Sequence, residues 1–175
     1  MPIPLERLQP GDVLLYRGGG LFSQLIRIKT WSRFSHVEIY DGDGWSWASR
    51  NGIGVNRYPV RVDDLDTALR LRPWIPFDMV AARAWALTVQ GQGYDWVGLL
   101  SFIIAKWQGR ENQKQFCSEF AARMFRYGIS AGAGLMPAGD RQKLDAMNYD
   151  PWRGRTADAI APQGFDDSPM FREVV

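Results

Sequence analysis

The sequence predicts an α+β fold in which a small antiparallel sheet packs against helices. Residues 36–40 and 68–72 alternate apolar with polar side chains, which is the period of a half-buried strand. Turn sequences rich in glycine and aspartate, such as 41–44, separate the strand segments as hairpin turns do. Phe116 and Phe120 begin a four-residue apolar repeat, and this repeat predicts an amphipathic helix.

The first half of the chain contains the predicted strands. A turn signal at 9–12 precedes the first of them. The glycines at 18–20 form a connector, because they lack the lysine and hydroxyl residue of a phosphate-binding loop. Residues 21–28 are expected to form a short helix with its apolar residues on one face. Strands are predicted at 13–16, 36–40, 45–49, 55–60 and 68–72.

The second half of the chain is predicted to be mainly helical. Residues 77–90 have the pattern of a helix whose core stripe is Val80, Ala84 and Leu87. A glycine-rich turn ends that helix. A second, more hydrophobic helix is predicted at 95–107, and a polar loop joins it to the helix that carries the cysteine.

The length of 175 residues predicts one domain, residues 1–175. Its core is expected to cover about residues 8–130. Beyond 130 the composition shifts toward glycine, proline and polar residues, so we expect 131–175 to be an irregular C-terminal extension. Within it, 139–147 forms a short helix at best, and 170–174 has the pattern of a terminal strand.

The composition argues against several classes of function. With 46% hydrophobic and 23% charged residues, the chain can bury a core and is not a disordered sequence. The net charge is +2 and no run of five basic residues occurs, so no nucleic-acid partner is expected. One cysteine excludes an internal disulfide, and a single histidine disfavours catalytic zinc. We therefore expect neither a metal nor a cofactor.

The chain carries no sequence signal for export or membrane insertion. Residues 1–6 lack the charged and then apolar layout of a signal peptide, so we expect cytoplasmic synthesis, with any export by another route. The longest apolar run, 97–105, is about half the length that crosses a bilayer. No transmembrane segment is predicted.

Cys117 is the only cysteine, and it falls at the start of the predicted amphipathic helix. Unpaired backbone N–H groups and the positive end of the helix dipole stabilise an anion at that position. Helix N-termini are accordingly a setting in which cysteine becomes a reactive thiolate. A lone cysteine is also often a small buried hydrophobe. Cys117 is therefore a candidate nucleophile, with a structural role as the alternative.

His36 is the only histidine, and it begins a predicted strand. A cysteine nucleophile needs a base within hydrogen-bond reach, and the base needs a group that orients it. His36 is the candidate base. Residues two apart on a strand share a face, so Glu38 lies beside His36 and is a candidate orienting carboxylate. The alternative for Glu38 is a solvent-exposed strand charge.

Three segments resemble, in this order, the motifs of the circularly permuted NlpC-type papain-like proteins, a branch that includes the YiiX-like and lecithin:retinol acyltransferase-like families. These segments are 11–16, 35–40 and 116–120. In ordinary NlpC-type peptidases the cysteine helix precedes the histidine strand, whereas in the permuted branch the histidine comes first, as it does here. Residues 94–100 and 116–120 also resemble small members encoded by bacteriophages. The resemblance implies a permuted papain-like fold with Cys117 as nucleophile and His36 as general base.

The third catalytic member departs from the family pattern. In the permuted families a glutamate on the strand after the histidine strand commonly orients the imidazole. The matching position in this chain is Trp47, which cannot serve that purpose. Glu38 is our first choice for the role, because a carboxylate best stabilises a charged imidazole. The alternatives are Ser46, Ser49 and Asn51.

The resemblance implies a thiol hydrolase of the cysteine peptidase or amidase type. It would cleave an amide through an acyl-enzyme on Cys117, whose backbone N–H would donate to the oxyanion. The NlpC likeness points to peptidoglycan of the bacterial cell wall as substrate and to a bacterial or phage origin, with virion association in the phage case. One alternative is a lipid-directed thiol acyltransferase or hydrolase with an acyl tunnel along 97–105. Another is a non-enzymatic phage structural or binding protein that keeps the fold.

The eight tryptophans suggest a further site. Trp31, Trp45, Trp47 and Trp152 are candidates for the lining of a binding groove. Aromatic residues at this density more often belong to a core or an interface, which is the alternative.

Overall fold

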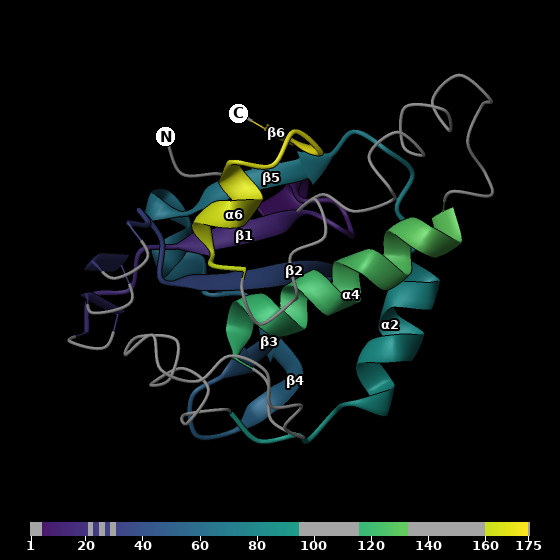
Figure 1. Ribbon diagram of the computed structural model, residues 1–175, viewed down its shortest axis with the longest axis horizontal. Helices are drawn as coiled ribbons and strands as arrows, with labels where there is room; N and C mark the ends of the chain where they lie inside the picture. Colours follow the sequence, from purple (N-terminus) through teal and green to yellow (C-terminus); the bar gives the residue numbers. More distant parts are fainter. Residues whose placement is uncertain are drawn as a thin grey trace.

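A six-stranded antiparallel sheet carries helix α4 (Cys117–Gly132) across one face (Figure 1). The computed structural model describes residues 5–20, 23–24, 27–28, 31–94, 116–132 and 160–174. The strands lie in the order β4-β3-β2-β1-β5-β6. This arrangement confirms the predicted α+β class, with the cysteine helix packed on a small antiparallel sheet.

The strands of the first half follow the predicted segments within two residues at each end. The 3-10 helix η2 (Val62–Thr67) precedes the fifth strand. The strands are β1 (Val13–Tyr16), β2 (His36–Gly42), β3 (Trp45–Arg50), β4 (Gly54–Pro59), β5 (Leu69–Pro73) and β6 (Phe171–Glu173), and the remaining elements are η1 (Leu5–Arg7), η2 (Val62–Thr67), α2 (Met79–Thr88) and α6 (Gln163–Asp166).

The turn between β2 and β3 fixes the register of the two strands that carry most of the site. Asp43 and Gly44 have φ angles of 52° and 78°, the pair of positive values that a tight type I′ hairpin requires. Aspartate and glycine tolerate this region better than other residues do. The turn places Gly42 opposite Trp45, and a register shift between Tyr40 and Gly42 then brings Tyr40 opposite Ser46 and Ile39 opposite Trp47. The sequence therefore predicts this hairpin correctly.

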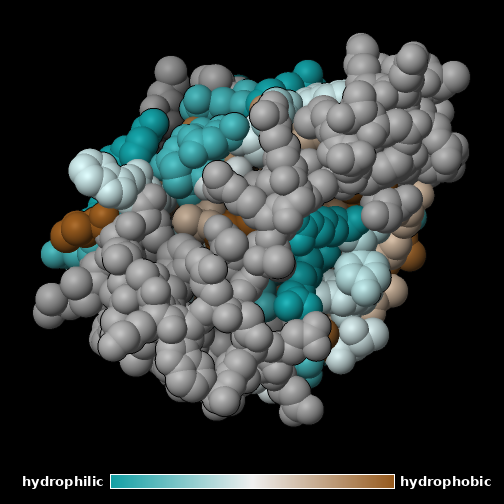
Figure 2. Space-filling view, in the orientation of Figure 1, coloured by the Kyte–Doolittle hydropathy of each residue, from teal (hydrophilic) through white to brown (hydrophobic). Residues whose placement is uncertain are grey.

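The main core lies between the sheet and α4. Phe120, Met124 and Phe125 are fully buried there, and Val37 and Ile39 of β2 meet them from the sheet. The predicted apolar stripe of the cysteine helix is thus confirmed. The outward side of α4 is hydrophilic (Figure 2), as expected for an amphipathic helix on a sheet.

Helix α2 buries a different face from the predicted one. Val80 and Leu87, expected in the core, are 75% and 55% exposed, whereas Ala82 and Ala86 are fully buried. The two alanines are small enough to let α2 approach α4 closely, and Trp85 stacks on Phe120 with ring centroids 5.7 Å apart. The prediction was wrong because it ranked faces by hydrophobicity, while close helix packing here depends on small side chains.

The described end of the chain joins the sheet. β6 pairs with β5, as the predicted terminal strand implied, and Phe165 of α6 is fully buried in the main core. The indole N–H of Trp74 donates to the carbonyl oxygen of Pro169 at 2.7 Å. In its described part, the extension expected to be irregular therefore contains a helix and a strand.

Several predicted elements fall wholly or partly outside the described residues. They include the helices at 95–107 and 139–147, with the apolar run at 97–105, and part of the helix at 21–28. No helix among the described residues combines the length and the apolar character needed to cross a bilayer.

Candidate active site

Cys117 is the first residue of α4 and is buried. Phe116, the residue before the helix, is buried in the interior. Glu119 places a negative charge in the first turn, where the helix dipole favours it. The first N–H groups of a helix have no acceptor within the helix. The sulfur lies 3.9 Å from the carbonyl oxygen of Ser35, the residue before His36. Cys117 therefore lies at an electropositive helix end beside the histidine strand.

His36 begins β2, directly opposite Tyr16 on β1. The alternation along β2 sends Val37 into the main core and leaves His36 and Glu38 on the other face. The imidazole Nε2 lies 3.0 Å from Oε1 of Glu38. Because Nε2 is engaged there, Nδ1 is the ring nitrogen that remains to interact with Cys117.

Glu38 is completely buried, so it is not the exposed strand charge that the sequence left open. Ser46 donates its hydroxyl to Oε2 of the carboxylate. Nε and Nη2 of Arg50 lie 2.9 and 2.8 Å from Oε1, and Nε of Arg61 lies 3.6 Å from the same oxygen. Both carboxylate oxygens therefore have partners, which fixes the orientation of the group that holds His36.

The charges of this cluster set its protonation. Burial lowers the pKa of His36, but the negative charge and hydrogen bond of Cys117, together with the hydrogen bond and charge of Glu38, raise it more, to about 9. Burial raises the pKa of Glu38, but the hydrogen bond and charge of His36, followed by the charge of Arg50, lower it to about 2. At neutral pH the site therefore holds an imidazolium against a carboxylate.

The raised pKa of His36 predicts that the protein loses stability in alkali. The folded state retains the His36 proton up to about pH 9, whereas the unfolded state loses it near 6.5. The contribution of this proton to stability is thus complete below pH 6.5 and is lost as the pH rises through 9. Urea unfolding between pH 6 and 10 should show this decline. The decline should be absent in His36→Gln, and equal slopes in the two proteins would contradict the assignment.

The other candidates for the orienting role occupy different places. Trp47 pairs with Ile39 and is buried in the main core, on the face opposite Glu38, so its position could not orient the imidazole. Asn51 is exposed in the turn after β3. Ser49 is buried within β3. Ser46 contacts Glu38 rather than His36.

Arg50 and Arg61 also contact Glu38, and neither was predicted from the sequence as a site residue. A signal existed for Arg50, because it lies four residues after Ser46 on the same strand and therefore shares its face. No sequence pattern indicates Arg61. It follows the end of β4, and the course of the backbone after that strand brings its side chain to Glu38.

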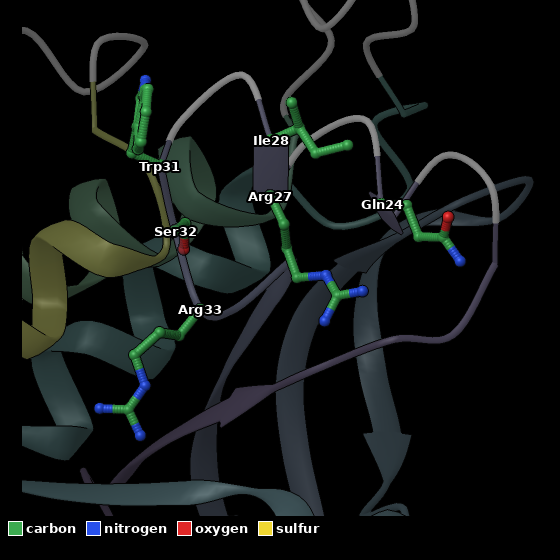
Figure 3. A pocket seen from close by; sticks show the side chains of 6 residues that line it. All are labelled: Gln24, Arg27, Ile28, Trp31, Ser32 and Arg33. Atoms are coloured by element: carbon green, nitrogen blue, oxygen red, sulfur yellow. The ribbon is translucent and has the colours of Figure 1, made fainter.

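A pocket of about 530 Å³ lies in the segment that leads into β2 (Figure 3). Its lining includes Trp31, which is 94% exposed, and the exposed side chain of Ile28. Of the tryptophans predicted to line a groove, only Trp31 contributes to this pocket. Trp47 is a core residue, Arg57 lies over the ring of Trp45, and Trp152 is outside the described residues.

The site has no arrangement that suggests a metal centre in the parts of the chain that are described. There, no three His, Cys, Asp or Glu side chains come together in a group able to hold a metal ion. The nitrogen and oxygen groups of the cluster are instead paired with one another.

The sheet and the cysteine helix laid across it form an α+β fold that is similar to a solved structure. A solved structure with this fold is the metalloprotein YiiX from Escherichia coli O157:H7. It aligns with a TM-score of 0.62 at 16% identity, covering 95% of this chain and 96% of that one. No model of a known protein family and no curated protein matches the sequence.

Proposed function

We propose that this chain is a thiol hydrolase that cleaves amide bonds through an acyl-enzyme on Cys117. The observation that supports the proposal most strongly is the chain of contacts from a cysteine at a helix N-terminus, through His36, to the buried carboxylate of Glu38. This is the nucleophile, base and orienting group that thiol acyl transfer requires.

The mechanism follows from the geometry of these groups. The Cys117 thiolate attacks the carbonyl carbon while His36 holds the proton at Nδ1. The backbone N–H of Cys117, at the start of α4, donates to the developing oxyanion. His36 then protonates the leaving amine, and water, deprotonated by the same imidazole, releases the acyl group from the sulfur. Glu38 keeps the ring oriented and stabilises its charged form.

The order of the motifs supports a circularly permuted version of the NlpC-type fold. His36 precedes Cys117 in the sequence, whereas ordinary NlpC-type peptidases have the reverse order. We further propose that residues 1–175 form one such domain and that its substrate is a peptide or amide bond of peptidoglycan. The overall likeness to YiiX, which spans nearly the whole of both chains, supports the single-domain assignment.

Hydrolysis of defined muropeptides tests the proposal. Purified protein should release new amine ends, and mass spectrometry after acid quenching should find an acyl adduct on Cys117. Cys117→Ala, as the matched control, should give neither. Equal release by the two proteins, or no release and no adduct from any muropeptide or activated acyl ester, would contradict the proposal.

A lipid-directed acyl transfer is the second candidate, and the pocket favours it. Ile28 and Trp31 give that pocket an apolar lining near the start of the histidine strand, where an acyl chain could lie. The two functions differ in their response to chain length. If Cys117 were acylated faster by long-chain than by short-chain p-nitrophenyl esters, and Trp31→Ala removed that preference, the lipid function would replace the peptidoglycan one.

A further inference from the structure

The Arg61 guanidinium has unused hydrogen-bonding capacity beside the candidate active site. Within the described residues it makes two ion pairs, 3.6 Å from Glu38 and 4.0 Å from Asp64, and no hydrogen bond. Arg50 differs, because it donates both to Glu38 and to the carbonyl oxygen of Pro59. The Arg61 side chain is 34% exposed, so its donors can be reached from solvent.

The position of Arg61 is fixed relative to the catalytic histidine. Its guanidinium lies over the ring of Tyr16, 5.7 Å from the centroid. The same tyrosine ring lies 6.2 Å from the imidazole of His36 and is buried between its neighbours. The cation and the imidazole also approach the same oxygen of Glu38, at 3.6 Å and 3.0 Å, so the two groups are neighbours around one buried carboxylate.

The ion pair between Arg61 and Asp64 is weak. Asp64 approaches only to 4.0 Å, and its side chain is 56% exposed, so water and salt screen this pair. A guanidinium binds a carboxylate best through two parallel hydrogen bonds at about 2.8 Å. A ligand carboxylate with that geometry would displace Asp64 at little cost.

We propose that Arg61 binds a carboxylate of the substrate and so selects acyl groups that carry a negative charge. This inference rests on the proposed thiol hydrolase and specifies its substrate class. Because Arg61 and His36 both lie beside Oε1 of Glu38, a carboxylate bound to Arg61 would lie a few residue lengths, each roughly 3.5 Å, from the scissile carbonyl. Arg61 acts here as a specificity residue and takes no part in bond breaking.

Bromoacetylated glycine peptides of one to three residues test the proposal without knowledge of the natural substrate. Cys117 displaces bromide from the bromoacetyl carbon, so a carbon–sulfur bond forms as the carbon–bromine bond breaks. Each peptide is used as the free acid and as the C-terminal amide, and the ratio of the two alkylation rates reports recognition of the carboxylate. Arg172→Gln, which removes an exposed charge from β6 at the far edge of the sheet, is the control.

In the native protein the acid should react faster than the amide at one peptide length. Arg61→Gln should lower that ratio about fivefold, because a partly exposed charged pair contributes modestly. The ratio cancels any change in thiol reactivity that the acid and the amide share, including one caused by loss of the Arg61–Glu38 ion pair. Asp64→Asn should raise the ratio by removing the competing carboxylate. An unchanged ratio in Arg61→Gln, or an equal fall in Arg172→Gln, would overturn the proposal. Failure of both acid and amide to label native Cys117 would instead refute the nucleophile itself.

Discussion

Replacement of His36 by alanine is expected to lower kcat/KM for amide hydrolysis by about a thousandfold, the loss typical when a general base is removed. In the proposed mechanism His36 is the base, and it is the group in reach of both Cys117 and Glu38. The same ring would protonate the leaving amine, so its loss should affect both halves of the reaction. The measurement is kcat/KM on the muropeptide that the native protein cleaves fastest.

The effect of His36→Ala has to be separated from misfolding. The imidazole lies at the start of β2, where backbone pairing with β1 continues without it. The melting temperature should therefore change much less than the rate does. Retention of more than about a tenth of native activity in folded His36→Ala would remove the histidine from the mechanism.

Glu38→Gln is expected to cost both activity and stability. The carboxylate is the partner of the imidazole and of the Arg50 guanidinium in a buried setting. Loss of the carboxylate charge leaves His36 and Arg50 without their buried counter-charge, at a cost of about 3 kcal/mol in the free energy of unfolding. We also expect kcat/KM to fall by about a hundredfold or more, because the amide cannot stabilise an imidazolium.

Asp41 provides a matched control for Glu38. It is a buried carboxylate on the same strand, and it pairs with Arg57 at 2.6 Å and with Arg83 at 2.9 Å, without any contact to His36 among the described interactions. Asp41→Asn should destabilise the protein by a similar amount and leave kcat/KM unchanged at a temperature where it is folded. If both variants lost the same fraction of activity, Glu38 would be a structural residue only.

Much of the fold could be predicted because its determinants are local. The period of two along β2 and the Asp43–Gly44 turn define a hairpin from adjacent residues alone. The apolar repeat of α4 likewise lies within one helix. The buried face of α2 was predicted wrongly, because close packing against α4 selects Ala82 and Ala86, a property of two helices rather than of one.

The candidate site was predictable only in part, for the same reason. His36 and Glu38 are neighbours on one strand, so the shared face was visible in the sequence. Their proximity to Cys117 was expected only through the resemblance of the ordered motifs. The contact of Arg61 with Glu38 arises where the chain leaves β4, and the contribution of Cys117 to the raised pKa of His36 comes from a distant helix. Neither has a local signature.

The most direct test of the catalytic assignment is the rate of Cys117 alkylation by iodoacetamide as a function of pH. A free thiol reacts appreciably only as the pH approaches about 8.5. In the native protein the rate should already be near its maximum at pH 7, as expected for a nucleophilic cysteine paired with a histidine at a helix N-terminus. His36→Ala should need alkaline pH to reach the same rate. Coincident profiles for the two proteins, or a native Cys117 that does not react at all, would contradict a catalytic Cys117–His36 pair.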